Sequence, residues 1–329
     1  MKVTEEEIRP EKVFDEYLRL TAADTITYFS DVEQIEISCP ACGGKGQDWA
    51  KKSLFSYQLC PDCLSIFVNP RPIMEAFNAY YTDSPSTKFW ATTFYKVTEA
   101  ARREKLWKPK AQMIKERMIK FGHGNPVKYI VDIGGGYGVF DEEIQKIMEI
   151  ETIIIEPSVH LAAICRQKGL QVIEKFMEDI VVGELPEGRK CYVSFELFEH
   201  LHDPTQFLTT VFNNMESGDI FVFTTLSSMG IDIQTLKEDA KALSPPHHLN
   251  FLNPKSVSAL LINNGFEVLE AITPGKLDMD ILRKNSEHIK DDFLKNVIKY
   301  STEDELANLQ EFISSAGLSS HMMITCIRP

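Results

Sequence analysis

The chain has 329 residues, of which 43% are hydrophobic and 25% are charged, so it is long enough for one large domain and a smaller one. Its formal net charge of -13 disfavours a polynucleotide as partner, because phosphate backbones are bound by basic patches. The first 20 residues do not resemble a signal peptide, and no apolar run reaches the roughly 18 residues of a membrane span. With an odd number of cysteines, seven, these features predict a cytoplasmic protein.

The N-terminal part of the sequence changes its pattern twice. Residues 5–30 carry a broken apolar stripe that predicts a helix, so we take 1–34 as an N-terminal helical segment. Residues 35–72 are short apolar runs separated by turn-forming residues, which predicts a small β-rich module. Residues 73–121 are aromatic and helical and end at the glycine-rich segment FGHGNP, so 73–125 should form a helical connector.

Four cysteines of the β-rich module form two C-x-x-C pairs, Cys39 with Cys42 and Cys60 with Cys63. Two such pairs about 15 to 20 residues apart suit one tetrahedral zinc ion held by four thiolates. Four protein ligands leave no position open for water, so we predict a structural zinc site. A redox role is the alternative, but neither pair begins a helix in a thioredoxin-like pattern.

From residue 126 onward, apolar strands alternate with helical stretches. We expect strands at 129–133, 152–157, 171–175, 191–196 and 219–225, with helices between them. Such alternation predicts a parallel sheet covered by helices on both faces. Two further strands should follow near the C-terminus, separated by a helical insertion around 278–316 that is either a lid, a partner surface or a helical pair packed on the domain.

The stretch VDIGGGYGVF joins the first of these strands to a helix. Its glycines Gly134, Gly136 and Gly138 allow a sharp turn and let a ligand lie against bare backbone. A nicotinamide fingerprint, G-x-G-x-x-G, would need a glycine at Val139. The observed G-x-G-x-G, with Asp132 two residues ahead, therefore argues against a nicotinamide dehydrogenase.

Two more motifs follow in order. Glu156 ends the next strand roughly 20 residues on, the spacing at which a carboxylate accepts both hydroxyls of a ribose. The segment CYVSFELFEHLHDPTQFL then places E-H-L and D-P between a strand and a helix. Together the three motifs resemble those of class I S-adenosylmethionine-dependent methyltransferases. The resemblance implies an α/β fold with a Rossmann-like, seven-stranded, mostly parallel sheet in residues 126–329, to which the small zinc ribbon and the helical segments are additions.

The resemblance also implies a set of residues that bind S-adenosylmethionine: Asp132, Gly134, Gly136, Gly138, Glu156, Glu178, Phe195 and Glu196. The aspartate and the glycines would line the methionine end of the cofactor, and Glu156 would hold its ribose. Phe195 and Glu196 would border the sulfonium. Glu178 would contact the adenine, although a solvated helix start explains this glutamate as well.

Methyl transfer to a hydroxyl or a carbon acid needs a base, and histidine is suited to that role at neutral pH. His200 and His202 follow the fourth strand, and His247 and His248 lie in SPPHHLNFLNPKSV. In related sugar and small-molecule methyltransferases a segment like P-x-H-x-x-F faces the active site, and His248 with Phe251 matches it. We therefore expect His248 as the base, ahead of His247 and His200. The alternative is that these histidines bond to loop backbone.

The order of motifs along the chain is similar to that of bacterial zinc-ribbon methyltransferases linked to surface-polysaccharide or other small-molecule biosynthesis. This order is C-P-x-C-G, C-P-x-C, F-x-N-P-R-P, an aromatic helix and a methyltransferase domain. The resemblance implies a sugar, nucleotide-sugar or polysaccharide end as acceptor, methylated on oxygen or carbon. Arg71 is a candidate for binding an anionic acceptor group, a surface salt bridge being the more common place for such a residue.

Two other functions remain compatible with parts of this pattern. A zinc-ribbon protein that methylates RNA would need a basic channel, which the net charge does not indicate. The other is a non-catalytic protein that binds S-adenosylmethionine or serves as a scaffold, in which the Rossmann-like domain has lost turnover; the intact glycine loop and Glu156 argue against it.

Overall fold

The computed structural model describes residues 5–122 and 126–329, and these form two compact units. The first unit contains the described residues up to Thr98 together with Thr225–Ala259 and Ala271–Met323. The second contains Glu99–Thr224, Leu260–Glu270 and Ile324–Pro329. Each unit is thus assembled from stretches that are distant in the sequence. The expected domain boundaries at residues 34, 72 and 125 stay a prediction. The segment FGHGNP lies partly outside the described residues.

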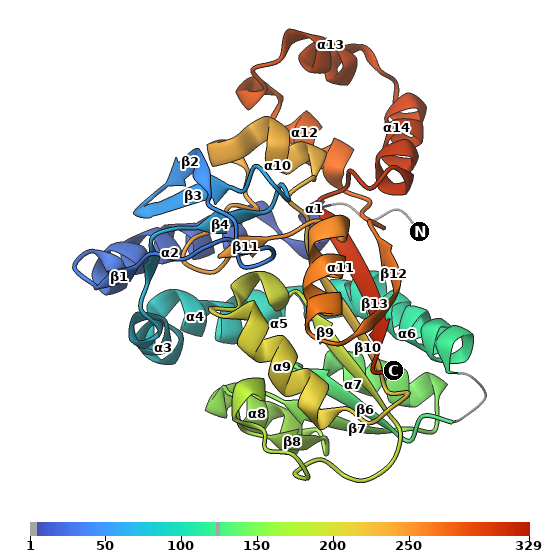
Figure 1. Cartoon of the computed structure of the whole chain (residues 1–329). Helices are drawn as coiled ribbons and strands as arrows, with labels where there is room; N and C mark the ends of the chain where they lie inside the picture. Colours follow the sequence, from blue (N-terminus) through green and yellow to red (C-terminus); the bar gives the residue numbers. More distant parts are fainter. Residues whose placement is uncertain (1–4, 123–125) are drawn as a thin grey trace. The chain divides into compact units, whose positions relative to one another are not determined.

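The second unit is built on a seven-stranded sheet with the order β12-β13-β10-β9-β6-β7-β8 (Figure 1). Its strands are β6 Tyr129–Ile133, β7 Glu151–Ile155, β8 Gln171–Ile173, β9 Lys190–Phe195, β10 Ile220–Leu226, β12 Glu267–Ile272 and β13 His321–Ile327. Strands β6 to β10 pair in parallel. The backbone bonds from Gly218 to Arg328 and from Ser227 to Ser320 show that β13 runs antiparallel to β10. This confirms the Rossmann-like α/β fold.

The central strands are apolar along their whole length because both faces of the sheet are covered. All six residues of β9 are buried, and so are the first six of β10. The helices of this sheet are α6 Lys108–Phe121, α7 Val139–Ile147, α8 Val159–Gln167, α9 Pro204–Asn214 and α11 Pro254–Asn263. Helix α9 begins at the D-P of the third motif, because Asp203 accepts bonds from two backbone N–H groups and Pro204 follows it.

The connector is helical, as predicted, but it contains two π-helical turns. Its elements are α3 Met74–Asp83, α4 Pro85–Phe89, a π turn at Trp90–Phe94, α5 Tyr95–Arg102, a second π turn at Arg103–Trp107, and α6. A π turn inserts one extra residue into a helix and often lies at a functional site. The second one immediately precedes α6.

The N-terminal helix is interrupted, which corrects the prediction of one helix over 5–30. Helix α1 covers Glu5–Ile8 and α2 covers Glu11–Phe29, with Pro10 as the residue before α2. Proline has no backbone N–H to donate and its ring clashes with the preceding turn, so the helix restarts there.

Among the described residues, no helix combines the length and the apolar character needed to cross a membrane.

The cysteine module of the first unit is an antiparallel sheet with the order β11-β4-β3-β2. Strands β2 Gln47–Lys52, β3 Phe55–Leu59 and β4 Ile66–Val68 come from the module itself. Strand β11, Asn250–Phe251, comes from the segment that carries His247 and His248, and Asn250 pairs with Phe67. A separate pair joins β1 Gln34–Ile35 to β5 Arg71–Pro72. The predicted ribbon therefore shares a sheet with the predicted catalytic segment.

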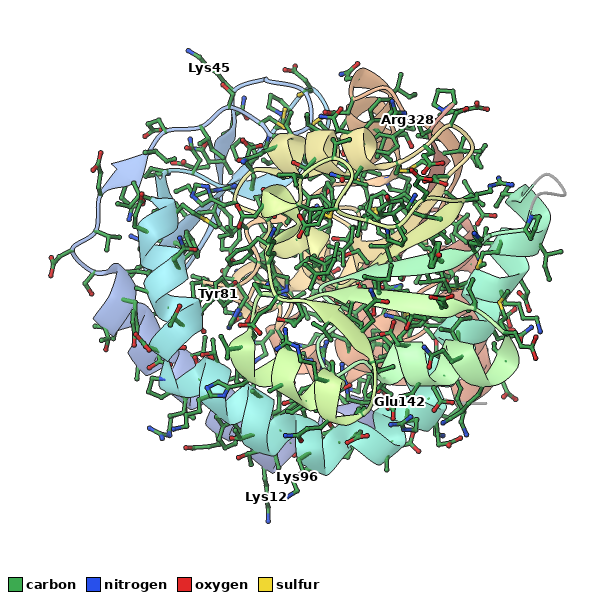
Figure 2. The ribbon with its side chains drawn as sticks, turned by 90° about the horizontal axis from the view of Figure 1, so that it is seen from below. Lys12, Lys45, Tyr81, Lys96, Glu142 and Arg328 are labelled. Atoms are coloured by element: carbon green, nitrogen blue, oxygen red, sulfur yellow. The ribbon has the colours of Figure 1, made fainter. Side chains whose placement is uncertain are left out.

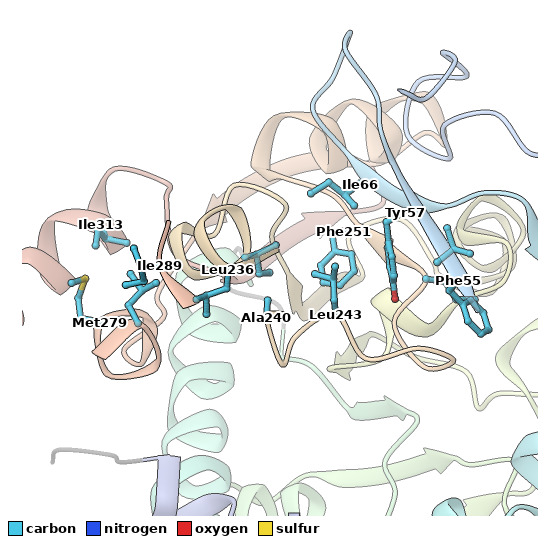
Figure 3. Close-up of a cluster of buried hydrophobic side chains, with 14 of the residues drawn as sticks. Phe55, Tyr57, Ile66, Leu236, Ala240, Leu243, Phe251, Met279, Ile289 and Ile313 are labelled. Carbon is cyan, nitrogen blue, oxygen red and sulfur yellow. The ribbon is translucent and has the colours of Figure 1, made fainter. Parts of the chain in front are cut away.

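A large hydrophobic core lies in the first unit (Figure 3). Phe55, Tyr57 and Ile66 enter it from the cysteine module, and Phe251 from β11. The helical insertion contributes through α12 Asp278–Lys284, α13 Asp292–Tyr300 and α14 Glu303–Ser315, for example by Ile313.

Charged side chains such as Lys12, Lys45 and Lys96 are exposed and project outward (Figure 2).

Candidate active site and zinc site

The glycine loop lies at the carboxyl end of β6. The N–H of Gly134 donates to the carbonyl of Ile155 over 2.8 Å, which ties the start of the loop to the end of β7. Gly136 has φ +57°, and a Cβ added there would meet nothing within 4 Å, so its α-carbon faces open space. Gly138 has φ +65°, and a Cβ there would lie 2.3 Å from Leu170. Packing explains Gly138, whereas Gly136 presents the bare backbone that a ligand needs.

Glu156 follows β7 and reaches back to this loop. Its Oε2 accepts a bond from the N–H of Gly136 over 3.0 Å, and its Oε1 accepts one from the N–H of Ser158 over 2.9 Å. The side chain is almost fully buried, and burial raises the pKa of Glu156 to about 7. A carboxylate has about four acceptor positions, so both oxygens can still accept a bond from a sugar hydroxyl.

Asp132 lies beneath the loop beside a second carboxyl group, Asp141, in the first turn of α7. Both side chains are buried. Burial, followed by the neighbouring Asp141, raises the pKa of Asp132 well above its ordinary value. Oδ1 of Asp132 is buried and has no hydrogen-bond partner among the described residues, so it can accept a bond from a ligand amine. Sequence reasoning missed Asp141, although an acidic residue in the first turn of the helix after a glycine loop was a usable signal.

Phe195 ends β9, and Glu196 follows it. The ring of Phe195 packs on Phe140 with centroids 4.8 Å apart. Glu196 has φ +53°, a left-handed conformation that costs a residue other than glycine about 1–2 kcal/mol. Its Oε1 accepts a bond from Oγ1 of Thr224 over 2.7 Å and lies 3.3 Å from Nζ of Lys110. Sequence reasoning missed Lys110, which contacts both predicted sulfonium neighbours.

Glu178 lies in a short turn, Met177–Asp179, after β8. It is half-buried, and burial raises its pKa. Its contact with adenine stays a prediction.

Three histidines were predicted as candidate bases, and two of them lie in the first unit. Nδ1 of His248 lies 2.6 Å from the carbonyl oxygen of Ala242. A carbonyl only accepts, so Nδ1 carries the proton and Nε2 is the basic nitrogen of His248. His200 lies in the second unit, at the end of the turn Phe198–His200, and is half-buried.

His247 has a different environment. Its Nε2 lies 2.7 Å from the hydroxyl of Tyr17 and 2.8 Å from that of Tyr80. The hydroxyl of Tyr80 also lies 2.9 Å from Oγ of Ser86. Burial, and then the neighbouring His248, lower the pKa of His247 to about 3. This imidazole is therefore neutral at physiological pH and fixed in a buried polar network.

The four cysteines of the module come together as predicted. The sulfurs of Cys39 and Cys63 lie 3.5 Å apart, as do those of Cys42 and Cys60, and all four lie within 4.8 Å of one another. A tetrahedral zinc ion with Zn–S bonds of about 2.3 Å separates its sulfurs by about 3.8 Å. The cluster therefore has the size and the ligand type that zinc requires.

Both C-x-x-C segments fold as equivalent backbone knuckles. The N–H of Gly43 donates to the carbonyl of Cys39, and the N–H of Leu64 donates to that of Cys60. Gly43 and Leu64 both have positive φ, +74° and +61°. The second knuckle is also fastened to the segment after β11, because Nδ2 of Asn253 donates to the carbonyl of Cys63 over 2.8 Å.

Arg71 is not on the surface, which corrects that expectation. Its side chain is 1% exposed, and its Nη2 donates to Oδ1 of Asn250 over 2.8 Å. It thus joins the edge of the cysteine module to β11.

A Rossmann-like sheet with a glycine loop after β6 and an acidic residue after β7 defines a fold that binds a nucleoside cofactor. Residues 101–271 match the family model described as "Methyltransferase domain", and the chain belongs to this family. It is an S-adenosylmethionine-dependent methyltransferase of class I, as the sequence motifs predicted.

Solved structures with a similar fold were compared with the chain. A putative sarcosine dimethylglycine methyltransferase from Galdieria sulphuraria is 14% identical, over 70% of this chain and 87% of that one, with a TM-score of 0.46. A cyclopropane synthase from Mycobacterium tuberculosis is 16% identical, over 65% and 83%, with a TM-score of 0.42. A glycopeptide N-methyltransferase complexed with S-adenosylmethionine is 12% identical, over 68% and 94%, with a TM-score of 0.43. No curated protein matches the chain.

Proposed function

We propose that this enzyme methylates a small molecule, namely a sugar, a nucleotide-sugar or a polysaccharide end, on oxygen or carbon. The bond from Gly136 to Glu156 carries the assignment of the cofactor residues, because it joins the two motifs of the donor site. The acceptor class rests on the resemblance of the whole motif order and on the net charge of -13, which disfavours RNA.

The donor residues are proposed from the geometry of the loop. S-adenosylmethionine supplies a methyl group on a cationic sulfonium, which is itself a good leaving group. Asp132 would accept a bond from the amine of the methionine part, and Gly136 would lie against it. Glu156 would accept bonds from the ribose hydroxyls. Phe195 and Glu196 would exclude water beside the sulfonium, and Glu178 would lie at the adenine.

We assign His248 the role of base, since its Nδ1 carries the proton and Nε2 is therefore the basic nitrogen. His247 is better suited to a positioning role, because Tyr17 and Tyr80 already engage its Nε2 and its pKa is low. His200 stays a second candidate for the base.

We also propose that Cys39, Cys42, Cys60 and Cys63 hold one structural zinc ion. The knuckle of Cys60 and Cys63 is fastened next to β11, so the ion would brace the segment of His248 through the shared sheet. Elemental analysis of protein purified without added metal should find about one zinc per chain; protein that is folded and contains no zinc would refute the site. Free thiolate ligands fit a reducing compartment, so a cytoplasmic location is part of the proposal.

The function is tested in two stages. Calorimetry should first detect binding of S-adenosylhomocysteine, the demethylated product. Formation of this product should then be followed with S-adenosylmethionine and a panel of sugars, nucleotide-sugars and oligosaccharides, with RNA as a parallel sample. Turnover on RNA alone would reject the small-molecule acceptor and favour the zinc-ribbon RNA methyltransferase. Binding without turnover on any acceptor would favour the non-catalytic alternative.

A further inference from the structure

Lys110, on α6, extends its ammonium to the end of β9, where Phe195 and Glu196 of the proposed donor site lie. Its Nζ lies 4.7 Å from the ring centroid of Phe195 and 5.1 Å from that of Trp107, so it stands over both aromatic faces. It lies 3.3 Å from Oε1 of Glu196, and its side chain is only 15% exposed. A lysine is rarely buried without a partner or a function. The ammonium of Lys110 has three N–H donors, and one ion pair with Glu196 does not use all of them.

The charges around the glycine loop explain why a cation is needed here. Asp132, Asp141, Glu156 and Glu196 place four carboxyl groups around the donor site. Lys110 opposes them electrostatically, since it lowers the pKa that burial and Asp141 raise at Asp132. Each of these carboxyl groups that is ionised repels a ligand carboxylate, and the ammonium of Lys110 offsets that repulsion.

The position of Lys110 is fixed by the elements around it. Arg103, in the π turn before α6, donates to Glu142 over 2.7 Å and to Glu143 over 2.7 Å. Both glutamates lie on α7, the helix that starts directly after the glycine loop. These bonds tie the base of α6 to the helix of the loop, and Lys110 follows about two turns further on.

A second donor lies in the same niche. Nε1 of Trp107 is buried and has no acceptor among the described residues, and the Trp107 ring packs edge-on against Phe195 with centroids 5.8 Å apart. A buried N–H without an acceptor costs about 1–3 kcal/mol, which a ligand oxygen would recover.

We propose that Lys110 binds the carboxylate of the methionine part of S-adenosylmethionine, and that Trp107 supplies a further N–H to it. The inference rests on the proposed donor site. It adds that this site selects a methyl donor that carries a carboxylate. The amine of the same methionine part would lie near Asp132, so the carboxylate would meet a cation and the amine a hydrogen-bond acceptor. Because Lys110 comes from the connector, this helix is part of the donor site.

The test compares two ligands that differ only in the carboxylate. These are S-adenosylhomocysteine and its decarboxylated analogue, which keeps the adenosine, the thioether and the amine. Their dissociation constants are measured by calorimetry for the wild type, for Lys110→Met and for Lys108→Met. Lys108 lies on the same helix and is half-exposed, with Glu104 as its partner, so it is the matched control.

Lys110→Met should weaken binding of S-adenosylhomocysteine by about 10- to 100-fold and should change binding of the analogue by less than about threefold. Lys110→Arg should restore part of the loss, and Lys108→Met should change neither constant. Equal losses for both ligands would overturn the proposal, because they would indicate general damage to the niche. Tighter binding by Lys110→Met would also overturn it, because Lys110 would then be a plug that the sulfonium displaces. Wild-type protein that binds neither ligand would instead reject the donor site as a whole.

Discussion

The N–H of Gly136 and Oε2 of Glu156 are 3.0 Å apart, so the glycine loop and the acidic residue after the next strand form one hydrogen-bonded unit. The loop positions the carboxylate, and the carboxylate in turn holds the loop in its left-handed conformation at Gly136. Binding of a ligand to the loop is therefore affected by the protonation state of Glu156.

Binding of S-adenosylhomocysteine should depend on the ionisation of Glu156. Burial raises the pKa of Glu156 from 4.5 to about 7, and only the carboxylate form accepts bonds from both ribose hydroxyls and both backbone N–H groups. The dissociation constant should therefore be about tenfold higher at pH 6 than at pH 8. Calorimetry across this range checks the trend. In Glu156→Gln the constant should be about 10- to 100-fold higher at pH 8 and nearly independent of pH.

The stability of the ligand-free protein should show the opposite sign. Between pH 4.5 and about 7 the folded state binds a proton at Glu156 that the unfolded state has released, so the free energy of unfolding should fall as pH rises through this window. Thermal unfolding of wild type and Glu156→Gln over this range measures the contribution. Parallel curves for the two proteins would show that Glu156 has an ordinary pKa.

Asp141→Asn should stabilise the protein at alkaline pH. Burial raises the pKa of Asp141 to about 6, and Asp132 is a second buried carboxyl group beside it. At pH 8 the variant no longer carries a buried charge at this position, so its melting temperature should exceed that of wild type by at least about 2–4 °C. At pH 4, where the carboxyl is protonated, the gain should disappear. A loss of stability at both pH values would instead indicate that the negative charge is needed at the start of α7.

His248→Ala should reduce turnover by about 10²- to 10⁴-fold on the acceptor that the panel of saccharides identifies, while the dissociation constant of S-adenosylhomocysteine stays unchanged. The reason is that Nε2 of His248 is the basic nitrogen. The acidic limb of the pH–rate profile should also be lost. His160→Ala, which removes an exposed histidine, serves as the control. Unchanged turnover by His248→Ala would remove this residue from the mechanism and leave His200 as the candidate.

Local patterns made much of the fold and site predictable. The apolar stretch of β6, the spacing from Asp132 to Glu156 and the two C-x-x-C pairs each depend on residues near one another in the sequence. The interruption of the first helix could have been read from Pro10, which was overlooked. In contrast, β11 is only two residues long and gains its partner in β4 from a segment about 180 residues away, so no local pattern indicates it.

Long-range contacts also explain the misplaced side chains. Arg71 is buried because Asn250 faces it from β11, and a sequence pattern does not reveal such a partner. Lys110 looks like any surface lysine of an amphipathic helix until the end of β9 brings Phe195 and Glu196 beside it. Residues whose roles depend on two distant segments are thus the ones that sequence reasoning missed.

Two neighbouring glycines of the first cysteine knuckle offer a matched test of the zinc site. A Cβ at Gly44 would lie 2.6 Å from Oδ2 of Asp62, the end of a flexible side chain, and 3.2 Å and 3.3 Å from the sulfurs of Cys60 and Cys42, all tighter than ordinary contact. A Cβ at Gly43 would meet nothing within 4 Å, although its φ of +74° makes alanine strained by about 1 kcal/mol. Gly44→Ala therefore disturbs the thiolates themselves, whereas Gly43→Ala strains only the backbone.

Gly43→Ala should keep about one zinc per chain and lower the melting temperature by a few degrees. Gly44→Ala should release zinc to a chelator at least about tenfold faster than Gly43→Ala, because its sulfurs cannot keep tetrahedral spacing. Metal content by elemental analysis and release to a coloured chelator measure both effects. Equal release from the two variants would mean that the crowding around Gly44 does not act on the metal.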